Sequence, residues 1–128
     1  MTTIRTVAII GAGQMGSGIA QAVATGGYAV RLYDADLSRL PLAHGTIANS
    51  LARRVERESL GADEAQAILG RISDAGDLAT VGKANLVIEA AVEDEAVKTD
   101  ILKSLTPHLG PETLVASNTS SISITRLA

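Results

Sequence analysis

The chain of 128 residues contains no cysteine, no tryptophan and no phenylalanine, and its aromatic residues are two tyrosines. Without cysteine it forms no disulfide, no zinc site with thiolate ligands and no cysteine nucleophile. The shortage of aromatic side chains removes the stacking surface that single-stranded nucleic acid requires. A formal net charge of −3, without a cluster of basic residues, leaves no electrostatic footprint for nucleic acid. We therefore expect no nucleic-acid partner.

Long apolar runs and a targeting segment are also missing. The longest apolar runs, such as residues 7–10, are far shorter than the roughly 20 residues that span a bilayer. The first five residues lead directly into a strand pattern, without the charged leader and apolar stretch of a signal peptide. These features predict a cytoplasmic protein without a membrane segment.

The residues that are present favour one folded domain. Hydrophobic residues make up 46% of the chain and charged residues 20%, as in globular proteins and unlike disordered chains. The length is enough for a single core, so we expect one domain over residues 1–128. A core of alanine, valine, isoleucine and leucine lets helices approach a sheet closely, which favours a layered α/β domain.

Strand and helix patterns alternate along the chain. Strand patterns cover Thr6–Ile10, Ala29–Tyr33 and residues 72–73, 85–89 and 113–116, and helix patterns cover residues 17–25, the segment after Asp36, and residues 62–69, 77–81 and 95–105. The last helix is expected to be amphipathic, with Val97, Ile101, Leu102 and Leu105 on one face. This alternation predicts a Rossmann-like, doubly wound α/β fold with a mostly parallel sheet and helices on both faces. Right-handed crossovers bring the carboxyl ends of the strands to one edge. We therefore expect residues 11–16, Asp34, residues 89–93 and residues 117–121 to share that edge.

A glycine pattern follows the first predicted strand. Gly11 allows a tight turn, Gly13 lets a pyrophosphate approach the backbone, and Gly16 lets a helix pack closely on the strand. The start of the next helix adds backbone N–H groups and the positive end of a helix dipole. In this setting the pattern predicts dinucleotide binding, the alternative being a purely structural glycine turn. The predicted cofactor-binding residues of this loop are Gly11, Ala12, Gly13, Gln14, Met15 and Gly16.

An acidic residue ends the second predicted strand. Asp34 lies eighteen positions after Gly16, where a carboxylate accepts hydrogen bonds from the adenosine ribose hydroxyls. The same charge repels a 2′-phosphate, and no arginine follows immediately, so NAD is favoured over NADP. The alternative is that Asp34 only caps the next helix. We assign that capping role to Asp36.

Four blocks of the sequence, taken together, resemble the L-3-hydroxyacyl-CoA dehydrogenase family. They are residues 11–20, residues 33–34, residues 87–93 (VIEAAVE) and residues 116–121 (ASNTSS). The last two are much more specific than the glycine loop. The resemblance implies the NAD-binding domain of an enzyme that oxidises the 3-hydroxyl of an acyl-CoA by hydride transfer to NAD, as in fatty-acid β-oxidation. It also implies a homodimer formed through a C-terminal domain that the 128 residues lack.

The resemblance implies cofactor roles for three further residues. Glu93 and Lys98 match positions that contact the nicotinamide half of NAD, and Asn118 lies near the nicotinamide. From the residues alone, Lys98 is equally well explained as a surface lysine paired with Asp94. The serine-rich loop around Asn118 is likewise typical of a turn that caps a helix.

Substrate roles are implied for three residues as well. Ser120 matches the catalytic-site serine that hydrogen-bonds the 3-oxygen of the substrate, and Ser50 and Arg57 match positions that touch CoA. A cation at position 57 preserves the contact with CoA phosphates. The alternative for Arg57 is a solvated helix face together with its charged neighbours.

The catalytic base of this family is a histidine oriented by a glutamate, and it follows the serine loop. The histidines of this chain are His44 and His108, and neither matches that position. We therefore expect the chain to bind NAD without appreciable turnover. Two alternatives stay open: the NAD domain of another 3-hydroxy-acid dehydrogenase, such as a gulonate type, and a non-catalytic NAD-binding module. A hydrolase that uses Ser120 is disfavoured because no histidine or acid is placed to activate it.

Overall fold

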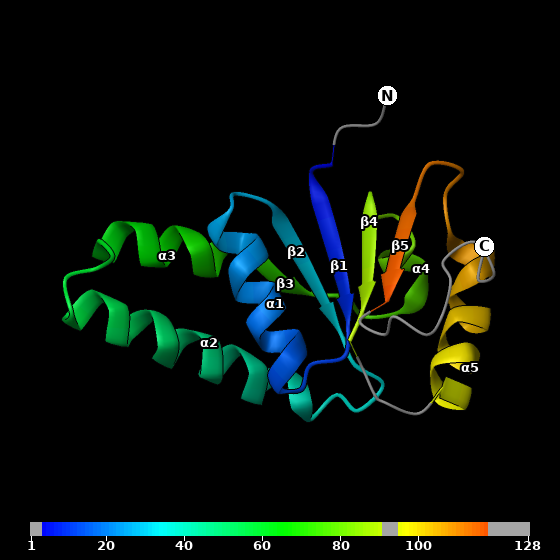
Figure 1. Ribbon diagram of the computed structural model, residues 1–128, viewed down its shortest axis with the longest axis horizontal. Helices are drawn as coiled ribbons and strands as arrows, with labels where there is room; N and C mark the ends of the chain where they lie inside the picture. The colour runs from blue at the N-terminus through cyan, green and yellow to red at the C-terminus, as the bar shows by residue number, and fades with distance from the viewer. Residues whose placement is uncertain (1–3, 91–94, 118–128) are drawn as a thin grey trace.

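The computed structural model describes residues 4–90 and 95–117. Within these residues, five parallel strands form one sheet in the order β3-β2-β1-β4-β5 (Figure 1). The strands are β1 Thr6–Ile10, β2 Ala29–Tyr33, β3 Ile72–Asp74, β4 Leu86–Glu89 and β5 Leu114–Ser117. The predicted Rossmann-like, doubly wound fold is confirmed.

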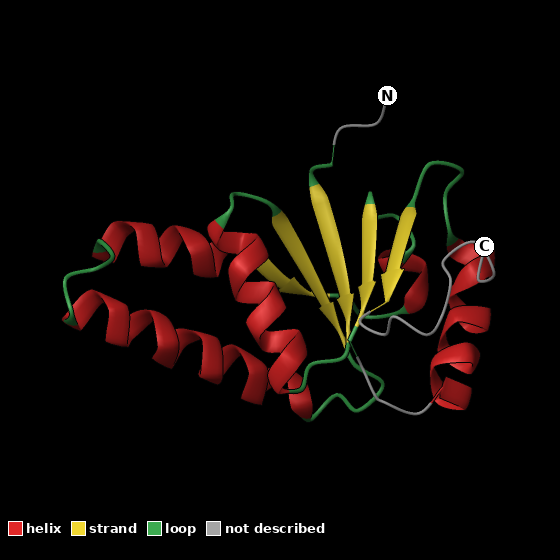
Figure 2. Cartoon of the chain, in the orientation of Figure 1, coloured by secondary structure: helices red, strands yellow, loops and turns green. Residues whose placement is uncertain are grey.

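The helices of the described residues cover both faces of the sheet. They are α1 Gln14–Thr25, α2 Arg39–Glu56, α3 Ala62–Gly70, α4 Leu78–Val81 and α5 Glu95–Leu105, with a 3₁₀ turn, η1, at Thr106–His108. Helices α1, α2 and α3 lie on one side of the sheet and α4 and α5 on the other (Figure 2). The strand order reverses between β1 and β4, and in open α/β sheets this switch point is where ligands bind.

Strand β1 is buried on both faces, as its unbroken apolar run predicts. Val7 and Ile9 belong to the core that includes α1, α2 and α3, whereas Ala8 and Ile10 belong to the core with α4 and α5. Each of these four side chains is at most 2% exposed. The alternation fixes the register of β1, so the loop that follows it emerges at a defined point of the carboxyl edge.

The start of α2 differs from the predicted one. The residue that precedes the helix is Ser38, and the side chain of Asp36 does not cap it. Instead, the Asp36 carboxylate accepts hydrogen bonds from the Ser38 backbone N–H and hydroxyl, at 3.1 Å and 2.6 Å. The cap prediction for Asp36 is therefore wrong, because the aspartate closes a tight turn with Ser38, and the helix begins only at Arg39, three residues after Asp36. Pro41 is the third residue of α2. Its missing N–H costs no helical hydrogen bond, because N–H groups in the first turn have no partner within the helix.

The buried face of α5 also differs from the predicted one. Val97 was expected in an apolar stripe with Leu102 and Leu105, but it is 42% exposed. Lys98, Leu102 and Leu105 are the buried residues, at helical spacing. The alternative that Lys98 is a surface lysine is wrong, because the side chain is only 2% exposed. Asp94, its partner in that alternative, lies outside the described residues.

Candidate cofactor site

The glycine loop lies at the carboxyl end of β1 and depends on glycine at two positions. Gly11 has φ of 111°, a conformation that favours glycine, and its N–H donates to the Tyr33 carbonyl at 2.8 Å. A Cβ atom on Gly16 would lie 1.7 Å from the carbonyl oxygen of Gly11, so no other residue fits there without moving the backbone. The predicted close packing of helix on strand is present in this contact.

The first turn of α1 has the character of an anion site. Helix α1 begins at Gln14, three residues earlier than predicted, so the second half of the glycine pattern is itself helical. Gly13 precedes the helix without a side-chain cap, and the first turn contains no acidic residue. The positive end of the helix dipole is therefore not offset by a carboxylate of its own first turn, which favours a bound phosphate.

Asp34 links the glycine loop to the turn after β2. Its Oδ2 atom accepts a hydrogen bond from the Ala12 N–H at 2.8 Å, and its Oδ1 atom accepts one from the Asp36 N–H at 2.8 Å. A carboxylate has about four acceptor positions, so these two bonds leave capacity for the hydroxyls of a ribose. The alternative that Asp34 caps α2 is wrong, because that helix begins after Ser38. Its ribose role stays a prediction.

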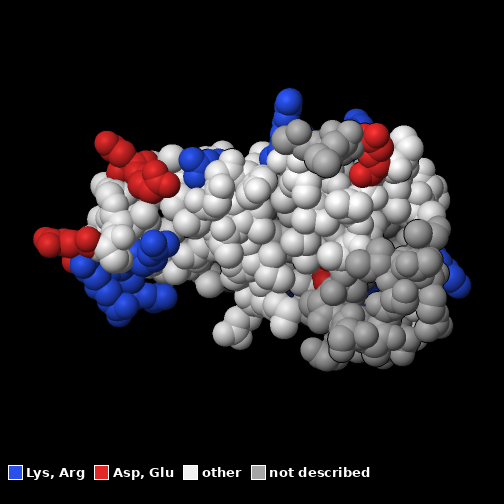
Figure 3. Space-filling model, turned by 45° about the horizontal axis from the view of Figure 1, so that its top comes forward, with Lys and Arg blue, Asp and Glu red and all other residues white. Residues whose placement is uncertain are grey.

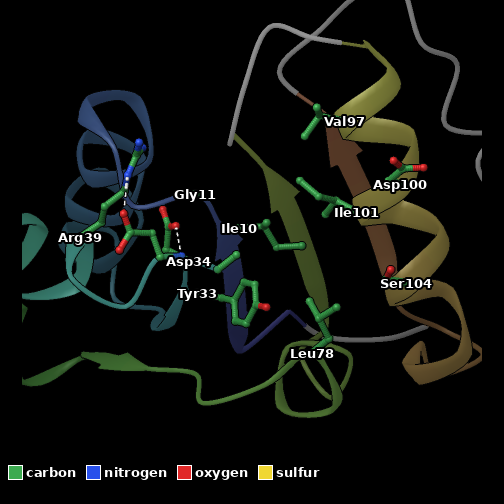
Figure 4. Close-up of a pocket in the computed structure, with 12 residues that line it drawn as sticks. Ile10, Gly11, Tyr33, Asp34, Arg39, Leu78, Val97, Asp100, Ile101 and Ser104 are labelled. Carbon is green, nitrogen blue, oxygen red and sulfur yellow. Dashed lines mark hydrogen bonds and ion pairs between the residues drawn. The ribbon is translucent and has the colours of Figure 1, made fainter.

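A hollow of about 420 Å³ lies beside Asp34, and we call it the Asp34 hollow. Ile10, Tyr33 and Leu78 form its floor, with Val97 and Ile101 of α5 on the far side from Asp34 (Figure 4). Its volume falls within the range of about 300–1,000 Å³ that is usual for small-molecule sites. An apolar slot that ends at a carboxylate suits a flat heterocyclic base attached to a sugar with free hydroxyls.

Arg39 is a functional candidate that spacing along the chain does not reveal. Its Nε atom lies 3.7 Å from the Asp36 Oδ2 atom. Hydrogen bonds from the Ser38 hydroxyl and backbone N–H, with a smaller contribution from the Arg39 charge, lower the pKa of Asp36, so this carboxylate is ionised at neutral pH. The sequence pattern considers only a basic residue directly after Asp34. Arg39 lies five positions further along, but the turn at Ser38 brings it to the same hollow as Asp34.

Lys98 forms an ion pair inside the protein. Its Nζ atom lies 3.6 Å from the Oε1 atom of Glu89, and the two side chains are 2% and 0% exposed. Glu89 is the last residue of β4, so the pair lies at the carboxyl edge on the opposite side of β1 from Asp34. The nicotinamide role of Lys98 stays a prediction, and the sequence pattern assigned no role to Glu89.

The remaining predicted site residues are not brought to the glycine loop by the described structure. Ser50 lies in the second half of α2, where its hydroxyl accepts a hydrogen bond from Gln21 Nε2 at 3.0 Å. Arg57 follows α2 and is exposed. Charged side chains gather at the outer end of the α2–α3 pair in the face shown in Figure 3. Glu93, Asn118 and Ser120 lie outside the described residues, so all five roles stay predictions.

Neither histidine lies at the glycine loop. His44, in α2, is half-buried, and its Nε2 atom is 2.6 Å from the Asp74 Oδ1 atom. His108 is exposed in η1, before the amino end of β5. Across residues 4–90 and 95–117, no group of three histidine, aspartate or glutamate side chains is arranged to hold a metal ion. None of the described helices has both the length and the apolar character needed to cross a membrane.

Comparison with known proteins assigns this glycine loop and sheet to a family. The family model described as "3-hydroxyacyl-CoA dehydrogenase, NAD binding domain" matches residues 6–128. The chain belongs to this family. The resemblance that rested on four sequence blocks is thereby confirmed, and so is NAD as the cofactor of this domain. The glycine loop and Asp34 are the features of the described structure that fit that cofactor.

Relatives of the chain carry related names but are much longer. The 3-hydroxybutyryl-CoA dehydrogenase of Bradyrhizobium diazoefficiens is 46% identical over 125 residues, which cover 98% of this chain and 43% of the relative. The 3-hydroxyadipyl-CoA dehydrogenase of Escherichia coli is 41% identical over 128 residues, covering all of this chain and 27% of the relative. The crystal structure of (S)-3-hydroxybutyryl-CoA dehydrogenase from Ralstonia eutropha superposes with a TM-score of 0.90 and 41% identity, over 98% of this chain and 44% of that one. The chain thus spans less than half the length of these relatives.

Proposed function

We infer that the chain is the cofactor half of an NAD-dependent oxidoreductase that acts on 3-hydroxyacyl-CoA thioesters. The observation that carries this inference is the glycine loop, in which Gly16 has no room for a side chain and Asp34 is bonded to the Ala12 N–H. Bound NAD supplies the acceptor for the hydride that leaves the 3-carbon of the substrate. The names of the relatives support the acyl-CoA substrate class.

The residues of this chain hold the cofactor in three places. The first turn of α1 binds the diphosphate through backbone N–H groups. Asp34 accepts hydrogen bonds from the adenosine ribose, and its charge disfavours a 2′-phosphate. The apolar floor of the Asp34 hollow takes the adenine ring. Lys98, held by Glu89 on the other side of β1, stands nearer the nicotinamide end.

The substrate contacts are assigned from the family pattern. Ser120 hydrogen-bonds the 3-oxygen, while Ser50 and Arg57 contact CoA. Relatives at similar identity are named for butyryl and adipyl groups, so the acyl group is selected outside the residues that hold NAD. We propose that the complete protein works as a homodimer in cytoplasmic acyl-CoA metabolism. The name of a further relative, a subunit of a fatty acid oxidation complex, supports the acyl-CoA metabolism alone.

The 128 residues alone are expected to bind NADH but to reduce acetoacetyl-CoA at a negligible rate. The physical reason is the position of the two histidines, since His44 faces Asp74 and His108 precedes the amino end of β5, so neither can move a proton at the glycine loop. An acetoacetyl-CoA reduction assay that follows NADH absorbance tests this, with the 3-hydroxybutyryl-CoA dehydrogenase of Bradyrhizobium diazoefficiens as the positive control. Robust turnover by the 128 residues would contradict the assignment of a cofactor half.

A further inference from the structure

Arg39 stands beside the glycine loop although it belongs to a different segment. It is the first residue of α2, and its Nη1 atom lies 3.9 Å from the place where a Cβ atom on Gly13 would be. Gly13 is the position at which the dinucleotide fingerprint lets a diphosphate approach the backbone. The Arg39 side chain is 54% exposed, so its guanidinium is accessible to a ligand that approaches the loop from solvent.

The guanidinium lies at the boundary between two hollows. On one side is the Asp34 hollow, with Arg39 at the end opposite α5 (Figure 4). On the other is a hollow of about 430 Å³, the Gly13 hollow, whose lining includes Gly13, Gln14, Leu42 and Arg39. A dinucleotide crosses the glycine loop with its adenosine on the β2 side of β1 and its nicotinamide on the β4 side. Arg39 lines both hollows beside Gly13, so it lies on the adenosine side, next to the loop that the diphosphate crosses.

Arg39 is held in this place by the turn before α2. Its Nε atom faces the Asp36 Oδ2 atom at 3.7 Å, while Nη1 is the atom near Gly13. Asp36 is itself fixed, because its Oδ1 atom accepts hydrogen bonds from the N–H and the hydroxyl of Ser38. The contact is exposed and longer than a hydrogen bond, so it favours this orientation of the guanidinium while leaving its N–H groups available to a ligand.

We propose that Arg39 is a cofactor-binding residue whose guanidinium donates hydrogen bonds to the diphosphate of NAD. This inference rests on the proposed binding of NAD at the glycine loop and adds a side-chain contact to the backbone contacts of α1. The planar fork of arginine matches the spacing of phosphate oxygens. Its positive charge also offsets the carboxylates of Asp34 and Asp36, which otherwise repel the two negative charges of the diphosphate.

The test is isothermal titration of NADH and of ADP-ribose into the Arg39→Gln variant. ADP-ribose carries the same diphosphate without the nicotinamide, so the affinity for both ligands is expected to fall by the same factor, about tenfold. The Arg39→Lys variant retains the charge without the fork and should fall in between. The matched control is Arg53→Gln, which removes an equal charge from the exposed last turn of α2 and should leave both affinities unchanged. Thermal unfolding should be unaffected in all three variants.

Two results would overturn the role of Arg39. They are unchanged NADH affinity in Arg39→Gln and a loss of NADH affinity without a loss of ADP-ribose affinity. Binding of NADH by the unaltered chain separates these results from a failure of the proposed function, because a chain that binds no NADH overturns both.

Discussion

Replacing Gly16 with alanine is expected to lower the unfolding free energy by about 3 kcal/mol or more and to abolish NADH binding. The added methyl group would lie 1.7 Å from the Gly11 carbonyl oxygen and 2.8 Å from its carbonyl carbon. Both are backbone atoms, so rotation of a side chain cannot relieve the overlap. Either α1 moves away from β1 or the glycine loop changes conformation, and each alters the anion site. Urea denaturation and an NADH fluorescence titration measure the two effects.

Gly18→Ala is the matched control for this substitution. Gly18 lies two residues further along α1 and is exposed, and a Cβ atom there would meet nothing within 4 Å beyond its own helix backbone. Alanine is a better helix former than glycine by up to about 1 kcal/mol, so this variant should be as stable as the unaltered chain or more stable. It should also bind NADH normally. Equal losses in the two variants would contradict the argument from close approach at Gly16.

Breaking the ion pair between Glu89 and Lys98 is the second change with a large expected effect. Glu89→Gln or Lys98→Met alone should lower the unfolding free energy by about 3–5 kcal/mol, because each removes one charge of a buried ion pair and keeps the other buried. The side chains are 0% and 2% exposed, so water cannot replace the lost contact without opening the core between β4 and α5. Chemical denaturation of each single variant gives the two losses.

The double variant Glu89→Gln/Lys98→Met shows whether the two charges act together. Removing both leaves neither charge of the pair in the core, so the loss of stability of the double variant should be well below the sum of the two single losses. Strictly additive losses would mean that the pair is not coupled. If the double variant folds, its NADH affinity also shows whether Lys98 contributes to the cofactor site, as the family pattern implies.

The fold was predictable because its main signals are local. The apolar run of β1 and the alternation of strand and helix patterns indicate a parallel sheet with two covered faces, and the structure has both. The ends of two elements were less predictable. Glycines are poor helix formers, so the pattern alone did not show that Gly16 lies inside α1. Asp36 is a good capping residue by type, but its bonds to Ser38 engage it in the preceding turn.

The parts of the candidate site that could be predicted are those in which the position along the chain and the residue type together indicate a single role. The glycines and Asp34 follow from spacing along the chain, and the structure packs Gly16 against Gly11 and bonds Asp34 to the Ala12 N–H, while their cofactor roles stay predictions. Arg39 and the Glu89–Lys98 pair depend on which side of a helix faces the sheet. Lysine is rarely buried, so the apolar pattern of α5 favoured a stripe through Val97, whereas the true buried face contains Lys98. Sequence spacing alone does not reveal that a distant carboxylate makes this burial possible.

Asp34 is the residue that we expect to determine the preference for NADH over NADPH. In Asp34→Asn one of the two carboxylate oxygens becomes an amide nitrogen, so either the Ala12 or the Asp36 N–H loses its acceptor and the ribose loses a charged partner. This variant should bind NADH about tenfold more weakly and be somewhat less stable. Asp63→Asn is its matched control, because Asp63 is exposed in α3, is not among the residues that line the hollow, and loses the same charge, so NADH affinity should not change.

The most direct test of cofactor binding at the glycine loop is calorimetric titration of NADH and NADPH into the unaltered chain and Asp34→Asn. The unaltered chain should bind one NADH per chain with saturation and bind NADPH at least about tenfold more weakly, and Asp34→Asn should narrow that difference. Two results would contradict this: no saturable NADH binding by the unaltered chain, or a preference for NADH that stays the same when the Asp34 carboxylate is removed.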